Sequence, residues 1–353
     1  PLLGSIADRA GIRKRMMMLY TLVCVVCVGL FVTIEPGMVL WGFILAVLAN
    51  VGFEGALVFY NAYLPELAPV ERQGFVSGVG FGVGYAGSIA GLLMALPLAQ
   101  NEQFDLLWLA VSGFFLLFSL PAFFALPKDG PAQVSVLQAA KEGITGFRRL
   151  VGEVWQEKEL RRFLLAFFFY IDGVLTVIVT AGLFAENTLG FEQADLIRLF
   201  LVVQVSALVG ALALAKPTDK FGAKRVISAS LVLWLTIAIS AFFVYEQSTF
   251  FIIAVMAGFG LGAIQAASRS LMASLIPEGK EAEMFGFYAF CGKSSSILGP
   301  LIFGTISSVS GGNQRLAVLS VAVFFIIGLA LLQRVNPPTG RAGRQSGPVT
   351  LGH

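Results

Sequence analysis

Apolar residues dominate the chain in long runs that short polar connections separate. Ten runs have about the 20 residues that a helix needs to cross the hydrocarbon of a bilayer. Each run must satisfy its own backbone hydrogen bonds in lipid, so we expect helices; the alternating pattern of a membrane barrel is not found. The expected spans are 16–34, 38–60, 75–97, 104–126, 163–184, 194–215, 226–245, 249–270, 284–308 and 315–333.

The composition agrees with a membrane protein. Hydrophobic residues make up 57% of the 353 residues, charged residues 13%, and the mean hydropathy is +0.84. A soluble domain has about 25% charged residues. The net charge of +3 gives no indication of nucleic-acid binding, and the only histidine is His353. The three cysteines lie in apolar runs, so we expect no metal, cofactor, disulfide framework or enzymatic activity.

Lysine and arginine residues are concentrated on one side of the expected helices. They occupy 9–15, 128–162, 216–225 and the region from 334 onward. The connections on the other side, 35–37, 100–103, 186–193, 246–248 and 311–314, contain neither residue type. The positive-inside rule therefore predicts that the basic side is cytoplasmic.

A polar loop near the start of the chain occurs a second time. Three residue pairs are separated by 211 residues: Asp8 and Asp219, Gly11 and Gly222, and Lys14 and Arg225. A second loop, at 67–69 with Gly78, recurs 208 residues later at 275–277 with Gly286. Two matches at nearly one spacing predict duplicated halves, a common feature of transporters.

These motifs carry a family resemblance. The stretch GSIADRAGIRK, residues 4–14, resembles the loop between the second and third helices of major facilitator transporters. The stretches FYNAYLP (59–65), YIDGV (170–174), QAASRS (265–270) and GKSS (292–295), with Gly299-Pro300, resemble the vacuole-effluxer family of autophagy-related amino-acid exporters and bacterial relatives. The resemblance implies an all-α membrane protein with the major facilitator fold, in which two six-helix halves surround a central pathway.

The repeat also predicts the domain organisation. We expect an N-terminal half at 1–126, a cytoplasmic linker with an interfacial amphipathic helix at 127–162, a C-terminal half at 163–334 and a disordered tail at 335–353. Pro1 aligns near Leu212, so the first half is expected to lack its first helix and most of its second, about fifty residues.

The duplicated loops are candidate gating elements. Asp8 is able to accept hydrogen bonds from backbone N–H groups at a helix start, where the macrodipole favours an anion. The resemblance implies that this helix is the one beginning near Met284, and that Asp219 contacts the helix beginning near Phe75. The gating set is Asp8, Gly11, Arg13, Asp219, Gly222 and Arg225. The alternative is a plain topological turn.

Ionisable residues inside the membrane are candidates for the transport pathway. Asp172 and Lys293 each lie about nine residues, roughly 13 Å, into a helix from the basic side. They are expected to pair as a structural salt bridge or to hold the two charges of a zwitterion. Glu54 is expected to carry a proton or to reach the interface. Arg269 is expected to extend toward the interface from a helix end or to anchor a loop. Uncharged candidates are Tyr170, Gln265 and Asn61.

A glycine-rich run lies in the third expected helix. Its G-x-G-x-x-G spacing, at Gly82, Gly84 and Gly87, also occurs in dinucleotide sites, but a membrane helix lacks the strand that such a site requires. The four-residue spacings Gly80/Gly84 and Gly87/Gly91 favour close helix packing instead. Gly299-Pro300 predicts a kink.

The sequence thus predicts a secondary active transporter that moves a small, amino-acid-like solute by alternating access, with proton coupling left open. The alternative is a non-transporting membrane sensor or scaffold, which would tolerate neutralisation of Asp172 and Lys293. We expect a monomer in the cell membrane of a bacterium or the vacuolar membrane of a fungus, with lipid and a small solute as its partners and no nucleic acid.

Overall fold

The computed structural model describes residues 1–145 and 147–337, and every regular element in these ranges is helical. The first part contains α1 (Leu2–Ala10), α2 (Arg13–Gly29), α3 (Val39–Asn61), α4 (Leu64–Leu67), α5 (Gln73–Gln100) and α6 (Phe104–Ala125), with two 3-10 turns at Leu30–Thr33 and Val70–Arg72. The connection contains α7 (Val136–Thr145) and α8 (Phe147–Gln156). The last part contains α9 (Lys158–Leu189), α10 (Gln193–Ala213), α11 (Ala215–Phe221), α12 (Ala223–Phe242), α13 (Gln247–Leu275), α14 (Glu281–Ser295), α15 (Leu298–Val309), α16 (Gln314–Ser320) and α17 (Ala322–Gln333).

Nine of the ten expected spans coincide with helices that are long and apolar enough to cross a bilayer, within the described residues. The prediction of one continuous helix over 284–308 is wrong, because this run is divided into α14 and α15. Pro300 lacks the N–H group that would bond to the carbonyl of Ser296, and its ring disfavours helical geometry just before it. The break at Ser296 and Ile297 lies at the kink that Gly299-Pro300 predicted.

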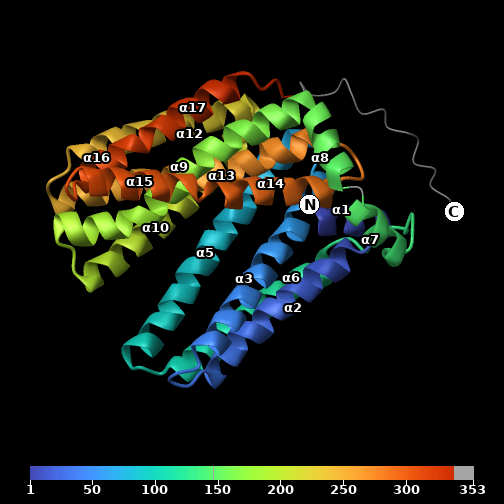
Figure 1. The fold of residues 1–353 in the computed structure, drawn as a ribbon, viewed down its shortest axis with the longest axis horizontal. Helices are drawn as coiled ribbons and strands as arrows, with labels where there is room; N and C mark the ends of the chain where they lie inside the picture. Colours follow the sequence, from blue (N-terminus) through green and yellow to red (C-terminus); the bar gives the residue numbers. More distant parts are fainter. Residues whose placement is uncertain (146, 338–353) are drawn as a thin grey trace.

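The spans form two bundles that meet at one end (Figure 1). The helices α2, α3, α5 and α6, coloured blue to cyan, run side by side, and α9 to α17 form the second bundle. The bundles converge where α1 contacts α14 and diverge away from it. We call this the basic end, because it carries the two duplicated loops and the connection between the bundles; the other is the opposite end. From its start at the basic end, α5 packs on α10, α11 and α13 of the second bundle.

The central connection is helical, as its amphipathic pattern predicted, and α7 packs on α1. Ala139 and Val154 are buried, whereas Leu137 and Trp155 are exposed. The connection therefore presents apolar side chains both to the protein and to its surroundings, as expected of a helix at an interface. Most of the polar tail predicted at 335–353 lies outside the described residues.

The glycine run in α5 packs on the second bundle through one of its faces. A Cβ atom added at Gly78 would lie 2.5 Å from the Cβ of Ala215, and one at Gly82 would lie 2.6 Å from the side chain of Leu212. At Gly84 and Gly87 no atom lies within 4 Å of such a Cβ. The close helix packing predicted from this run is therefore present, but of Gly80, Gly84, Gly87 and Gly91 only Gly80 contacts the second bundle, together with Gly78 and Gly82.

Candidate functional site

Asp8 joins the two bundles at the basic end. Its Oδ1 accepts a hydrogen bond from the backbone N–H of Ala282 at 3.1 Å, and its Oδ2 accepts one from that of Glu283 at 3.0 Å. These N–H groups lie in the first turn of α14, where unpaired donors and the helix dipole both favour an anion. Arg13 donates to Asp8 at 2.5 Å and also to Glu281, so its positive charge lies beside both carboxylates and stabilises the contact.

Burial raises the pKa of the Asp8 carboxyl to about 6, while Arg13 and the two backbone N–H groups oppose this shift. Asp8 lies before the first membrane-spanning helix, and its side chain is only 2% exposed. At neutral pH the carboxyl is therefore still mostly ionised and accepts hydrogen bonds through both oxygens.

Asp219 makes the same contact in the second copy of the loop. Its Oδ1 accepts from the N–H of Gly74 at 2.7 Å, and its Oδ2 accepts from that of Phe75 at 3.0 Å. Both donors lie at the start of α5 in the other bundle. The two contacts expected from the sequence are thus present in the structure, one in each direction across the bundles.

The turns after the two aspartates also match. Gly11 and Gly222 have positive φ angles of 59° and 90°, which a side chain would strain. Lys14 donates from its Nζ to the carbonyl of Leu126, at the end of α6. In the second copy Lys224, rather than Arg225, makes the corresponding bonds to the carbonyls that end α17. The pairing of Lys14 with Arg225 is therefore one residue out of register, and Arg225 is exposed.

Arg269 on α13 is buried between the bundles. Its Nε donates to Ser77 Oγ at 2.9 Å, its Nη2 to the Ser77 carbonyl at 2.8 Å, and its Nη1 to Asn61 Oδ1 at 3.1 Å. The guanidinium carbon also lies 4.4 Å from the ring centre of Phe81. The expectation that Arg269 extends to the interface is therefore wrong: only 7% of the residue is exposed. Asn61, a sequence candidate, is one of its partners.

Two further polar contacts lie near Arg269 on the same helix. Gln265 accepts a hydrogen bond from the hydroxyl of Tyr85 on α5 at 3.2 Å, so it too bridges the bundles. The hydroxyls of Tyr170 and Ser268 lie 2.7 Å apart within the second bundle. Of the uncharged candidates, Asn61 and Gln265 each form a hydrogen bond between the bundles, whereas Tyr170 forms its hydrogen bond within the second bundle.

Asp172 contacts the break between α14 and α15 and does not pair with Lys293. Its Oδ1 accepts from the N–H of Gly299 at 3.1 Å, in the first turn of α15. Its Oδ2 and the hydroxyl of Thr176 are buried with no hydrogen-bond partner among the described residues. The carboxylate therefore stabilises the start of a half-helix inside the membrane, as at a helix N-terminus in water.

Lys293 pairs with Glu54 instead. Its Nζ lies 2.6 Å from Glu54 Oε1 and joins α14 to α3 across the bundles. The Lys293 side chain is 62% exposed and that of Glu54 28% exposed. Asp172 and Lys293 share a depth but belong to different contacts, so the expectation that they form one site is not met by this geometry. Near the opposite end, Asp195 and Arg198 form a local ion pair three residues apart on α10.

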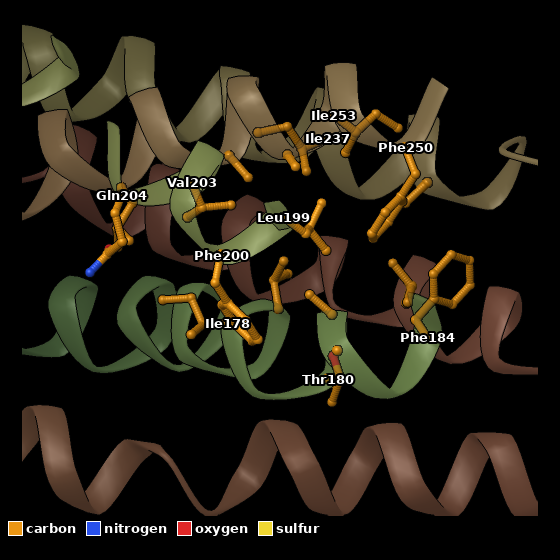
Figure 2. Close-up of a pocket in the computed structure, with 18 of the residues that line it drawn as sticks. Ile178, Thr180, Phe184, Leu199, Phe200, Val203, Gln204, Ile237, Phe250 and Ile253 are labelled. Atoms are coloured by element: carbon orange, nitrogen blue, oxygen red, sulfur yellow. The ribbon is translucent and has the colours of Figure 1, made fainter. Parts of the chain in front are cut away.

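A cavity of about 680 Å³ lies in the half of the molecule nearer the opposite end. It is bounded by α5, α9, α10, α12 and α13, and Figure 2 shows Phe184, Phe200 and Phe250 among its lining residues. Thr180 and Gln204 add polar groups to this mostly apolar wall. The buried indole nitrogen of Trp234, another lining residue, has no hydrogen-bond partner among the described residues. Such a cavity suits a small solute with an apolar part.

Along α13 the cavity and the contacts between the bundles follow one another. The cavity ends at Leu261, Gln265 lies one turn further toward the basic end, and Arg269 another turn beyond. The region of Gln265 and Arg269, about 6 to 12 Å from the last cavity residue, thus closes the cavity from the basic end. The described residues contain no group of three or more acidic, cysteine or histidine side chains that could hold a metal ion.

Comparison with known proteins decides the family. The family model described as "Vacuole effluxer Atg22 like" matches residues 1–345. The chain belongs to the Atg22-like vacuole effluxer family. This Atg22-like protein is 30% identical over 349 residues to the MFS-type transporter YxiO of Bacillus subtilis, covering 96% of the chain and 81% of YxiO. It is 25% identical to autophagy-related protein 22 of Yarrowia lipolytica, covering 96% and 73% of the two chains.

Solved structures show the same fold for the Atg22-like chain. The human organic anion transporter MFSD10 superimposes with a TM-score of 0.73 at 15% identity, covering 94% of this chain and 80% of that one. The fucose:proton symporter FucP of E. coli gives a TM-score of 0.71 at 16% identity, covering 96% and 89%. The protein is therefore an integral, multi-pass transporter of the major facilitator superfamily, and its family is one of transporters rather than enzymes.

The sequence did not point to several residues of this site. Ser77 and Tyr85 lie in the glycine run, where the small residues dominated the interpretation. Phe81 contributes only the face of its ring. The one available signal was Arg269 itself, a cation six residues before the end of a largely buried helix.

Proposed function

We propose that the protein is a secondary active transporter that moves a small, amino-acid-like solute by alternating access. The observation that carries this proposal is the unequal closure of the two ends. The polar contacts of Asp8, Asp219 and Arg269 hold the bundles together toward the basic end. The cavity lies on the other side of these contacts.

The contacts are of a kind that can separate. Each aspartate reaches backbone N–H groups of the opposite bundle, and water can replace a carboxylate there when the bundles move apart. Opening would require both contacts to break, since they cross the bundles in opposite directions. If the positive-inside rule holds here, the basic end is cytoplasmic and this conformation is open away from the cytoplasm.

The cavity supports the class of solute. Aromatic and aliphatic walls would hold an apolar side chain, while Gln204, Gln265 and Arg269 offer polar groups toward the basic end. The description of the family as vacuole effluxers, and the names of neighbours as a fucose:proton symporter and an organic anion transporter, agree with a small solute. Coupling to protons would involve Asp172 or Glu54, the carboxylates that lie within the described spans away from the helix ends.

The test is uptake by proteoliposomes that contain the full chain, with each of the twenty amino acids offered with and without a pH gradient. We expect saturable uptake of apolar amino acids above that of empty liposomes. A stimulation by the gradient that is lost in Asp172→Asn or Glu54→Gln would identify the coupling residue. No flux of any amino acid under either condition would remove this class of solute and favour a non-transporting role.

A further inference from the structure

Arg269 is a buried cation that pairs with no opposite charge among the described residues. It donates hydrogen bonds to the hydroxyl and carbonyl oxygens of Ser77 and to the amide oxygen of Asn61, all of them neutral, and it also interacts with the side chain of Tyr60. No carboxylate pairs with it in the part of the chain that the structure describes. Burying a guanidinium without an anion is unfavourable, so this position is costly in the closed state.

The surroundings of Arg269 are shaped for it. A Cβ atom at Gly80 would lie 2.8 Å from Nη2, so the absence of a side chain there leaves room for the guanidinium. The ring of Phe81, at 4.4 Å, covers the flat face. The planar edge of the group, with its fixed fork of N–H donors, is left for oxygen acceptors.

All the hydrogen-bond acceptors of Arg269 belong to the other bundle. Ser77 lies on α5 and Asn61 ends α3, whereas Arg269 lies on α13. When the bundles separate at the basic end, Arg269 loses these acceptors together and its N–H groups face the opening pathway. A carboxylate is the ligand that matches the fork with two parallel hydrogen bonds and also neutralises the charge.

We propose that Arg269 binds the carboxylate of the transported solute, and that Ser77 and Asn61 occupy the same donors when no solute is bound at that point. This inference rests on the proposed function and assigns the residue that holds the carboxylate of its amino-acid-like solute. The carboxylate and the neutral acceptors compete, so solute binding and closure at the basic end are linked.

The test compares two probes that differ at one group, L-phenylalanine and L-phenylalaninamide, in proteoliposomes of the full chain. We expect the wild-type protein to take up phenylalanine with a clear preference over the amide. Arg269→Gln should raise the KM for phenylalanine at least about tenfold and abolish the preference, because it removes the charge and the fork. Arg269→Lys, which keeps the charge alone, should lie between the two.

Arg198→Gln is the matched control, since Arg198 is an exposed cation at the opposite end paired within its own helix. It should keep the wild-type KM and preference. An Arg269→Gln protein that folds, by its melting temperature, and keeps the wild-type preference for the carboxylate would overturn this proposal. Equal uptake of both probes by the wild type would overturn it as well while leaving transport intact. Uptake of neither probe would remove the cargo class, and this proposal with it.

Discussion

The two aspartates at the basic end contribute to holding the bundles together. Replacing both, as Asp8→Ala with Asp219→Ala, removes four hydrogen bonds from backbone N–H groups to carboxylates. Losing a capping side chain costs about 1 kcal/mol, and the charge at the helix start adds about 0.3–1 kcal/mol. In the open state water bonds to the same N–H groups, so only the closed state loses these contributions.

The magnitude follows from the burial of the two sites. Asp8 is almost fully buried and also holds Arg13, so its loss should cost about 2 kcal/mol; Asp219 is partly exposed, so about 1 kcal/mol is expected. The two contacts share no partner, so their effects should add. A sum of about 3 kcal/mol lowers the ratio of closed to open molecules by about 100-fold.

Distances between spin labels on the two bundles measure this ratio. Glu71 and Arg334 are exposed, lie at the basic end on opposite bundles, and can be changed to cysteine for labelling. The native cysteines, which are free, would first be replaced by alanine. We expect a new, longer distance population in the double variant and an intermediate population in each single one.

The control replaces a carboxylate that does not bridge the bundles. Asp195 pairs with Arg198 three residues away near the opposite end, so Asp195→Ala should leave the distances unchanged. If the double variant folds and keeps the wild-type distance distribution, the aspartates are simple turn residues and the reasoning fails.

Two further predictions concern the discontinuous helix. A Cβ atom at Gly299 would lie 1.7 Å from Thr176 Oγ1, so Gly299→Ala should lower the melting temperature strongly. Gly304→Ala is the control and should leave the melting temperature unchanged, because no atom lies within 4 Å of a Cβ there. Equal melting temperatures of the two variants would contradict the packing of α15 on α9. Glu54 and Lys293 form a pair across the bundles, so Glu54→Lys or Lys293→Glu alone should reduce transport and the double exchange should restore part of it. Activity of the double exchange no better than that of the worse single variant would show that the pair has no role of its own.

The sequence predicted the contacts at the basic end because they depend on short, repeated loops. The spacing of Asp8 and Asp219 from their glycines recurs in both halves, and the resemblance to major facilitator transporters named the helices that they reach. Such contacts follow from residue type and order along the chain. The register error between Lys224 and Arg225 arose because the second copy has one residue fewer after its glycine.

The sequence suggested that Asp172 and Lys293 form one site, and it could not show that they belong to different contacts, for a physical reason. Counting residues from a helix end gives the depth of a side chain, but the direction that it faces depends on how the helix is rotated against its neighbours. The same limit applies to Arg269, whose distance from the helix end suits either an interface or a buried site. Only the packing of α5 against α13, with Asn61 at the end of α3 bonded to Arg269, distinguishes these possibilities.

The break at Ser296 and Ile297 divides the mechanical attachments of one span. Its first segment is attached to Asp8 and Glu54 of the N-terminal bundle and also packs on α9, whereas its second segment is held by Asp172 of α9 in the C-terminal bundle. A rotation of one bundle can therefore be absorbed by a change of angle between α14 and α15. In that case the second segment, α15, remains packed on α9, and the surrounding lipid need not be displaced along the whole length of the span.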